Sequence, residues 1–547
     1  MRGRWAVAVA VTAVLAASCG DDSDRAGDDD ETTATASAQT IEVVDLRGQA
    51  AAGNYPEVEV RVVDNEFVDG AIRIDPGVTV AWHNDGRVEH NIVTVSEEPD
   101  FGVDTDAFGP GSEHEFRFTE PGVYPYYCSL HGTADAGMTG TIVVGDVPAD
   151  LASAGPRTVP SGPPQTISVP TDVSTIQEAV DSVPPGSLVL VEPGTYAEAV
   201  VITTDRIVLR GLDRDESVLD GGGTLPNGVL VLADGVAIEN LTARNYRVNG
   251  FFWNGVTGFR GSYLTAIDNV LYGVYAFDST MGIFEHSYAA GSTDSGFYVG
   301  QCDPCDTLIT DVVAENNQQG FSGANASVGL SIVNSVWRSN RAGIILSTLD
   351  SEGLAPQHDA LVAGNRVDGS GAEAAPRRAD GFLDLLYGLG IGVIGGLDDV
   401  VTSNRVTASP RAGIAVSPNP AIQENFWPSE RNRVTGNAAS GSVLYDLALV
   451  AVPDAGDNCF SANEFATSTP SAVEDAVPCD ATGTGDVVTG ALDLGAYLAM
   501  EAPPSPPPRP SVVPPQPDMP NARRQPAAPA VDLDVAVDMA AIRLPAT

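Results

Sequence analysis

Three side chains that bind soft metal ions lie close together in the segment PYYCSLHGTADAGM, residues 125–138. Cys128, His131 and Met138 offer a thiolate, an imidazole and a thioether within eleven residues. This combination suits copper, whereas zinc prefers four firm ligands and does not use methionine. The segment therefore predicts a metal site, and a further ligand must come from elsewhere in the chain.

The missing ligand should be a second imidazole, supplied by an earlier strand that passes close to the cysteine. His90, in VEHNIVTV, begins an apolar run. His83 follows Trp82 in a strand-like stretch, and His114, in GSEHEFRF, alternates with charged residues and is expected to be solvated. The residues alone favour His90 and leave His83 and His114 as competitors.

Short β-like runs fill residues 41–146, which must position these ligands. The runs EVEVRVVD, AIRIDPGVTVAWHN, HEFRFTEPGVYPYYC and GTIVV alternate apolar and polar residues and are separated by Pro-Gly and Asp-Gly breaks. This pattern predicts a small β-sandwich. Residues 147–165, rich in Pro, Ser and Gly, are expected to form a linker.

The segment from about 57 to 145 resembles the plastocyanin-like cupredoxins, small β-sandwiches that carry type 1 copper. The resemblance rests on EFVDGAIRIDPGVTVAWHNDGRVEHNIV and FTEPGVYPYYCSLHGTADAGMTGTIVV. It implies one type 1 copper per chain, held by His90, Cys128 and His131 with Met138 as a weak axial ligand. His83 matches no ligand of the family. Six residues separate His131 from Met138, more than in plant plastocyanin, so the axial distance and the reduction potential differ from the family pattern.

A repeat of about 23 residues begins after residue 166. Glycines followed by apolar residues recur with gaps of 22 to 24, at Gly228, Gly250, Gly273, Gly296, Gly320 and Gly343. One period is too short for two helices but holds three short strands and three turns, which is one coil of a parallel β-helix. We therefore expect an all-β chain, a cupredoxin sandwich followed by a right-handed parallel β-helix over 166–495. A short helix over 172–183 should cap its first coil.

Residues 166–495 resemble the right-handed parallel β-helix proteins, which include pectin-degrading enzymes and a periplasmic copper-maturation protein. The opening STIQEAVDSVPPGSLVLVEPGTYAEAVVI is similar to the first coil of pectinesterases, but their later catalytic segments are missing. Esterase activity is therefore not expected, since fold alone says little about function. Charged residues that a polysaccharide lyase could use are expected to be ordinary solvated or turn residues: Arg377, Arg378, Asp380, Asp384, Asp268, Glu285, His286 and Asp294.

The N-terminus, MRGRWAVAVAVTAVLAASCG, combines two arginines, a short apolar run and a cysteine in LAASC. It resembles a lipoprotein signal peptide, residues 1–19, with Cys19 as the lipidated residue. The protein should then be exported and anchored to the cell membrane, or periplasmic or secreted if Cys19 is only a cleavage site. Residues 20–40 are expected to form an acidic disordered tether, and residues 496–547 a proline-rich disordered tail.

The remaining cysteines fit an exported protein. Cys302 and Cys305, in CDPC, are expected to form a small structural disulfide rather than a redox or metal pair. Cys459 and Cys479 bracket a loop near the end of the repeat and are expected to pair there. With Cys19 and Cys128 assigned elsewhere, these two disulfides account for all six cysteines.

The charge of the chain limits its partners. The net charge is −45 and all 28 basic residues are arginine, a surface that repels nucleic acid and anionic membranes. We expect an electron-transfer or copper-handling protein whose β-helix is a docking scaffold for a redox partner or a copper-receiving enzyme. The membrane would be reached only through the lipid. The alternative is a glycan-binding or polysaccharide-degrading β-helix with an accessory copper domain.

Overall fold

The computed structural model describes residues 44–45, 57–63, 65–68, 70–86, 88–96, 98–134, 136–147, 159–350, 353–378, 381–419, 425–452, 456–480, 492–499, 501–502 and 511–546. These residues all belong to one compact unit of the chain, Val43–Thr547. The expected signal peptide, with Cys19, and the expected tether lie outside the described residues, as does part of the linker.

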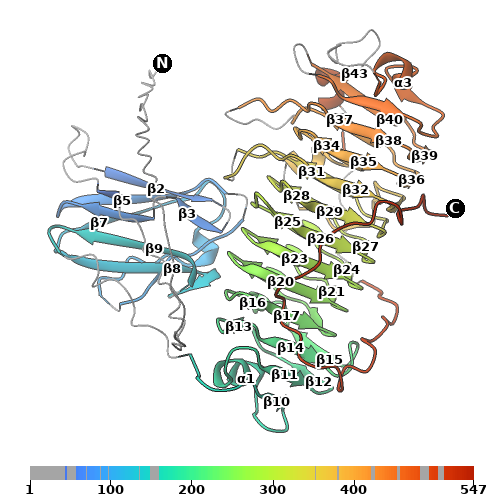
Figure 1. Cartoon of the computed structure of the whole chain (residues 1–547). Helices are drawn as coiled ribbons and strands as arrows, with labels where there is room; N and C mark the ends of the chain where they lie inside the picture. Colours follow the sequence, from blue (N-terminus) through green and yellow to red (C-terminus); the bar gives the residue numbers. More distant parts are fainter. Residues whose placement is uncertain are drawn as a thin grey trace, which may run out of the picture. The chain divides into compact units, whose positions relative to one another are not determined.

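The N-terminal domain is a β-sandwich of two sheets (Figure 1). One sheet has the order β1 (Val44–Asp45), β4 (Ala71–Ile74), β9 (Ala136–Val144), β8 (Gly122–Thr133) and β6 (Val93–Thr94). The other has the order β3 (Glu66–Val68), β2 (Glu57–Val63), β5 (Val78–Asn84) and β7 (Glu113–Phe118). A short 3-10 helix, η1 (Thr105–Ala107), lies between β6 and β7.

The core of the sandwich follows from the alternation along β5. Val78, Val80 and Trp82 point inward and are buried. The Trp82 ring lies 5.8 Å from Phe101 and 5.5 Å from Tyr126, measured between centroids. Because Tyr126 is two residues before Cys128, this aromatic core fixes the strand that carries the predicted metal ligand Cys128.

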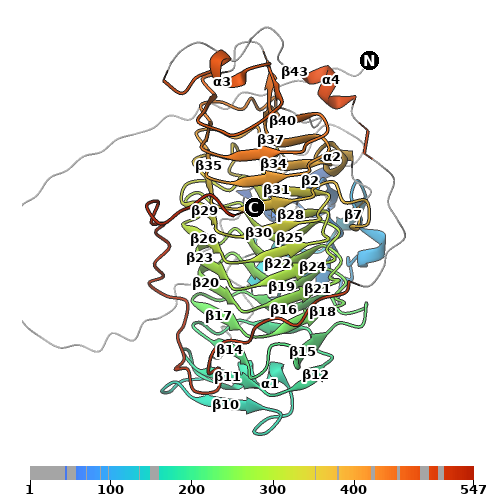
Figure 2. The ribbon, with the colours of Figure 1, turned by 90° about the vertical axis from the view of Figure 1, so that its right-hand side faces the viewer.

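The repeat region folds as the expected right-handed parallel β-helix, three long parallel sheets built from stacked coils (Figures 1 and 2). The first sheet consists of β10 (Thr166–Val169), β11 (Leu188–Val191), β14 (Val208–Gly211), β17 (Val236–Glu239), β20 (Thr257–Ser262), β23 (Thr280–Glu285), β26 (Thr307–Thr310), β29 (Leu330–Val333), β32 (Leu361–Ala363), β35 (Val400–Thr402), β38 (Arg433–Thr435) and β41 (Cys459–Ser461).

The other two sheets repeat this arrangement. The second consists of β12 (Gly194–Tyr196), β15 (Ser217–Asp220), β18 (Thr242–Arg244), β21 (Thr265–Ile267), β24 (Tyr288–Ala290), β27 (Val313–Glu315), β30 (Val336–Arg338), β33 (Arg366–Asp368), β36 (Arg405–Thr407) and β39 (Ala438–Ser440). The third consists of β13 (Val200–Ile202), β16 (Asn227–Val231), β19 (Asn249–Asn254), β22 (Tyr272–Phe277), β25 (Ser295–Gly300), β28 (Gln319–Ala324), β31 (Ala342–Ser347), β34 (Leu389–Ile394), β37 (Ala412–Ser417), β40 (Tyr445–Ala451) and β42 (Ser468–Thr469), with β43 (Leu492–Asp493) paired to β40.

The recurring glycines occupy the second residue of successive strands in the third sheet. A Cβ added at Gly228 would lie 2.4 Å from the carbonyl oxygen of Gly250, and one added at Gly250 would lie 2.6 Å from that of Gly273. The coils stack at this spacing only because these residues lack a side chain. The residue after each glycine points inward, is fully buried and stacks in register: Val229, Phe251, Val274, Phe297, Phe321 and Ile344.

Buried asparagines form a second ladder at a corner of the coil. The backbone N–H of Asn365 donates to the side-chain oxygen of Asn404, and the backbone N–H of Asn404 donates to that of Asn437. The asparagines of GNRV, SNRV and TGNA therefore satisfy backbone groups that a sharp turn leaves unpaired.

Short helices close or flank the stack. In α1 (Ile176–Ser182), Thr175 caps the N-terminus by accepting from the N–H of Glu178, and Ile176, Ala179 and Val180 are buried against the first coil. This helix matches the one expected over 172–183. The other helices are α2 (Gly381–Leu385), α3 (Val473–Ala476) and α4 (Leu494–Leu498).

The C-terminal segment 511–546 differs from the disordered tail expected from its composition. It runs along the β-helix (Figure 2), where Arg210 donates to the carbonyls of Gln525 and Pro526 at 2.7 and 3.1 Å. The N–H of Ala530 donates to the carbonyl of Gly235, and Ile542 is buried. A proline-rich strand lacks donors but offers carbonyl acceptors, so arginines on the β-helix can hold it.

Candidate metal centre

The sequence-predicted ligands lie on neighbouring elements of the sandwich. Cys128 and His131 are on β8, Met138 is on β9, and His90 precedes β6. The antiparallel pairing of β8 and β9 shifts register between Tyr127 and Gly132, which is where the first two ligands lie. Such an irregularity turns side chains of one strand toward a common point.

Three ligand atoms converge in the interior. Sγ of Cys128 lies 3.8 Å from Nδ1 of His90 and 3.4 Å from Nδ1 of His131. The ligand atoms of all three lie within 4.8 Å of one another, and no more than 2 % of any of these residues is exposed. Met138 is buried in the same hydrophobic cluster as Cys128. The structure thus brings three of the four predicted residues, His90, Cys128 and His131, together.

Two asparagines hold the segment that carries His90. The amide of Asn84 donates to the carbonyls of Val88 and Phe108, at 2.9 and 3.1 Å. The side chain of Asn91 accepts from the N–H of Ser129 and donates to its hydroxyl, both at 2.8 Å. Asn91 therefore ties the residue after His90 to the residue after Cys128, and the two ligands keep a fixed separation.

Burial sets the protonation state of the metal-free ligands. It raises the pKa of the Cys128 thiol to about 11, although backbone N–H groups of Asn91, Leu130 and His131 oppose this by stabilising a thiolate. It lowers the pKa of His90 to about 3, and Nε2 of His90 has no hydrogen-bond partner among the described residues. The site therefore offers a neutral imidazole and a thiol whose proton a metal must displace.

The donor set fits copper. Two imidazoles, one thiol and a nearby thioether in a buried, apolar setting are the ligands that copper favours over zinc or hard cations. Such a set accommodates both Cu(I) and Cu(II), which is the chemistry of electron transfer. The two competing histidines lie outside this group. His83 lies 3.6 Å from Glu113, and His114 contacts the carbonyl of Phe101 at 2.9 Å.

Residues of the β-helix also contact the ligand segment, and sequence reasoning did not find them. The amide of Asn227 donates to the carbonyl of Leu130 at 2.8 Å, and that of Asn254 donates to the carbonyl of His131 at 2.9 Å. Arg247 pairs with Glu89 and Asp106. Asn227 precedes a ladder glycine as Asn249 does, and that repeated Asn-Gly was the available signal.

The charged candidates on the β-helix are mostly paired. Arg378 lies 3.4 Å from Asp294, a pair that sequence reasoning had not joined, and Arg377 pairs with Asp384. Asp380 lies outside the described residues.

The other charged candidates are satisfied locally. Asp268 accepts from Ser511 of the C-terminal segment, and Glu285 accepts from Ser262. His286 lies 2.5 Å from Asp311. Each of these three side chains therefore has a local hydrogen-bond or ion-pair partner.

The four remaining described cysteines form two disulfides. Cys302 bonds to Cys305 within one coil, and Cys459 bonds to Cys479 near the C-terminal end of the stack. Cys128 is the free cysteine of the described chain.

Comparison with known proteins identifies the family of the N-terminal domain. Residues 56–145 match the family described as copper binding proteins, plastocyanin/azurin family. Plastocyanin of Scenedesmus fuscus is 34% identical over 85 residues, 14% of this chain and 85% of that protein. The major chloroplastic plastocyanin of Arabidopsis thaliana is 31% identical over 108 residues, which span 64% of its length. The A-module of the Azotobacter vinelandii mannuronan C-5 epimerase AlgE6 covers 56% of this chain and 91% of its own, at 14% identity and a TM-score of 0.38.

Proposed function

Because the chain belongs, through residues 56–145, to the plastocyanin/azurin family of copper-binding proteins, we propose that it holds one type 1 copper ion and transfers single electrons. His90, Cys128 and His131 would hold the ion, with Met138 as axial ligand. When bound, copper supplies a one-electron couple. The protein supplies buried, pre-positioned ligands and excludes water, so that little must move when the charge changes.

One observation carries this proposal: three metal-binding side chains meet in the buried interior of the matched domain. The buried side-chain amide of Asn84 in the same sandwich donates two hydrogen bonds. His90 Nε2 has none among the described residues, and burial keeps the ring neutral, as a ligand must be. Burying polar side chains costs free energy, and metal binding would account for the burial of His90, Cys128 and His131 together.

Copper content tests the assignment of His90. We expect the full chain to bind one copper per molecule. Loss of a residue that only supports a ligand typically lowers metal affinity about 10- to 100-fold, and we expect His90→Gln to lower copper affinity by at least that much. His83→Gln is the matched control, since His83 lies in the same sandwich, on β5 of the other sheet, and outside the ligand group. Equal loss in the two variants, or full retention by His90→Gln, would overturn the ligand assignment.

We further propose that the protein is exported and anchored through Cys19. The two disulfides support an oxidising compartment. Among the described residues, no helix has the length and apolarity needed to cross a membrane. Mass spectrometry of the processed protein tests the proposal: a lipid-modified N-terminal Cys19 supports it, and an unprocessed leader contradicts it. In this proposal the β-helix serves as the docking surface for a redox partner or a copper-receiving enzyme.

A second candidate function is glycan binding or cleavage on the β-helix. The observation that favours it is the pairing of Asp294, which precedes β25, with Arg378 of the segment between β33 and β34. This pair places a carboxylate and a guanidinium together beside Ser295 and Gln319. Incubation of the full chain with acidic polysaccharides decides the matter. Unsaturated products that disappear in Asp294→Asn would support this function, and an inert chain across a broad panel would remove it.

A further inference from the structure

The β-helix closes over the segment that carries two of the ligands. Asn227 and Asn254 hold the carbonyls of Leu130 and His131, and only 2 % of His131 is exposed. Leu130 is also buried. This edge of the sandwich therefore faces the chain's own third sheet rather than solvent, and a partner protein has no direct access to His131 here.

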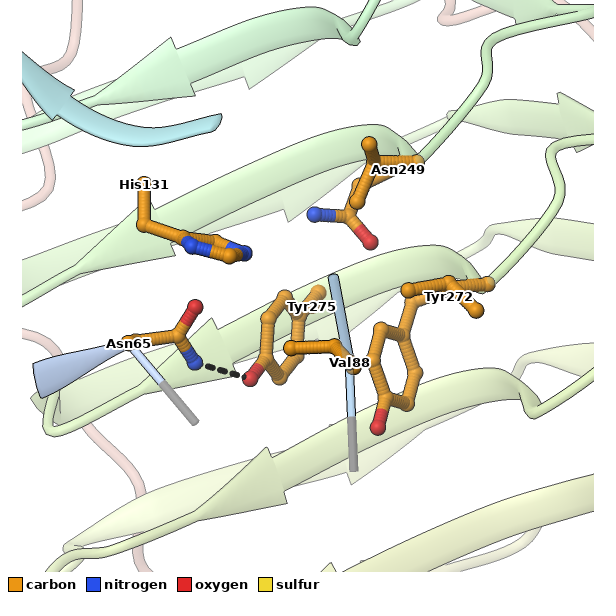
Figure 3. Close-up of a pocket in the computed structure, with 8 residues that line it drawn as sticks. Asn65, Val88, His131, Asn249, Tyr272 and Tyr275 are labelled. Carbon is orange, nitrogen blue, oxygen red and sulfur yellow. Dashed lines mark hydrogen bonds between the residues drawn. The ribbon is translucent and has the colours of Figure 1, made fainter. Parts of the chain in front are cut away.

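A small cavity lies at this contact. Its volume is about 10 Å³, room for at most one water molecule. Figure 3 shows the ring of His131 beside Asn65, Tyr275 and Asn249 at the cavity wall. Asn65 donates to the hydroxyl of Tyr275 at 2.6 Å. The interface is thus tightly packed and joined by hydrogen bonds, as a permanent contact is.

Three aromatic rings beside His131 form part of a cluster on the outer side of the third sheet, separate from the interior core of the β-helix. Phe252 meets the imidazole edge-on, with centroids 6.3 Å apart and planes at 83°. Phe252 stacks on Tyr275 at 4.5 Å and 18°, and Tyr275 stacks on Tyr272 at 4.3 Å and 16°. No more than 3 % of any of these three aromatic residues is exposed.

This ring column follows from the register of the third sheet. Phe252 and Tyr275 are paired neighbours on β19 and β22, and Tyr272 is the first residue of β22. Two residues before Tyr272 the chain reaches the surface, where Val270 is 45% exposed. The column therefore begins at the predicted ligand His131 and ends at Tyr272, two residues along the chain from an exposed turn.

We propose that Phe252, Tyr275 and Tyr272 form an electron conduit between His131 and the surface at Val270. This inference rests on the copper-binding function proposed above. Electron tunnelling weakens exponentially with the gap to be crossed, and rings in contact leave short gaps. When the metal is oxidised, a one-electron carrier at the turn accepts the electron. When the metal is reduced, the carrier donates it. No bond forms, no proton moves and the rings return unchanged.

A photo-oxidant attached at the turn tests the conduit. The test uses a full chain with Val270→Cys, which provides an exposed thiol for a ruthenium polypyridyl label, and Cys19→Ser, which removes the other thiol outside the site. Cys128 is buried and would be bound to copper, so it should not react with the label. Flash oxidation of the label then draws an electron from Cu(I). We expect Tyr275→Leu to slow this transfer by about an order of magnitude, because the lost ring leaves a gap that its surroundings fill only in part.

Two controls separate the ring from its hydrogen bond and from the general surface. Tyr275→Phe keeps the ring and loses the contact with Asn65, so its rate should stay near that of the parent. A label at Val95→Cys, which is 39% exposed and lies next to β6 of the sandwich, should give a rate that does not depend on Tyr275. An unchanged rate in Tyr275→Leu, or equal slowing by Tyr275→Phe, would overturn the conduit.

A measurement without metal tests the first contact. In the metal-free protein, proton NMR should show nuclear Overhauser effects between the imidazole of His131 and the ring of Phe252; their absence would contradict the proposal. The visible spectrum separates the two levels of inference. A chain with no blue copper band overturns the proposed function and the conduit with it. A blue chain whose rates ignore Tyr275 overturns the conduit alone.

Discussion

Replacing Gly343 with alanine is expected to lower the free energy of unfolding of the β-helix by about 3 kcal/mol, the upper part of the range for overpacked sites. The new Cβ would lie 2.2 Å from the carbonyl oxygen of Gly390 and 2.7 Å from Cγ1 of Val367. The first neighbour is backbone of the next coil, so relief requires β31 and β34 to move apart and to weaken their pairing. Guanidinium denaturation measures the loss.

Alanine at two other glycines, Gly296 and Gly353, should cost progressively less stability than Gly343→Ala. A Cβ at Gly296 would lie 2.8 Å from the side-chain nitrogen of Asn317 and 3.1 Å from the carbonyl oxygen of Gly320. Because its closest neighbour is a side chain rather than backbone, Gly296→Ala should cost less than Gly343→Ala. At Gly353 the nearest atom is a flexible side-chain oxygen of Gln301 at 3.4 Å, and alanine there should change stability by about 0.5 kcal/mol or less. If the three variants were equally stable, close stacking would not be the reason for the repeated glycine.

Asp399→Asn is expected to stabilise the protein by up to about 4 kcal/mol at pH 8 and hardly at all at pH 4, since each pKa unit is worth about 1.4 kcal/mol. Burial raises the pKa of Asp399 to about 7, against hydrogen bonds from Gln357 and Ala360. One carboxylate oxygen accepts both bonds, and the other has no partner among the described residues.

The sign follows from which state holds the proton. Below the ordinary pKa of 3.8 both the folded and the unfolded chain keep Asp399 protonated. As pH rises from there to about 7, the unfolded chain loses the proton while the folded chain retains it, so stability falls. Above that range the loss is constant. The asparagine variant lacks this dependence and continues the column in which Asn432 and Asn458 already stand.

Asp446 is the matched control because its pKa moves the other way. Burial alone would raise the pKa of Asp446, but hydrogen bonds from the backbone N–H groups of Ala466, Ser442 and Thr467 lower it overall. Its ionised form is therefore favoured by folding, and Asp446→Asn should lose stability at pH 8. Unfolding curves at pH 4 and pH 8 compare the two variants. Stabilisation of both at pH 8 would contradict the assignment.

The β-helix could be predicted because its period is visible in the spacing of single residues along the sequence. A glycine followed by an inward apolar residue, such as Phe297 or Phe321, recurs in the successive coils from Gly228 to Gly343, and this pattern needs no knowledge of distant contacts. The C-terminal segment could not be predicted in this way. Its carbonyls are held by Arg210, about three hundred residues earlier, and composition alone does not identify such a partner.

The proposed copper ligands could be predicted because three of them share one short segment of chain. His90 was chosen over His83 and His114 by its place before an apolar run and by resemblance, and the structure brings His90 to Cys128. The contacts from Asn254 and Phe252 could not be anticipated, because they depend on how the β-helix meets the ligand segment. Local patterns determine the ligands, whereas tertiary packing determines their surroundings.

The visible absorption spectrum of the full chain on addition of Cu(II), recorded beside Cys128→Ser, tests the copper centre most directly. Cys128 supplies the thiolate that a type 1 site requires, and its side chain is fully buried. We predict an intense blue thiolate-to-copper band that saturates at one equivalent in the parent and does not form in the variant. A colourless parent, or a band that survives the loss of Cys128, would contradict a type 1 copper centre in this protein.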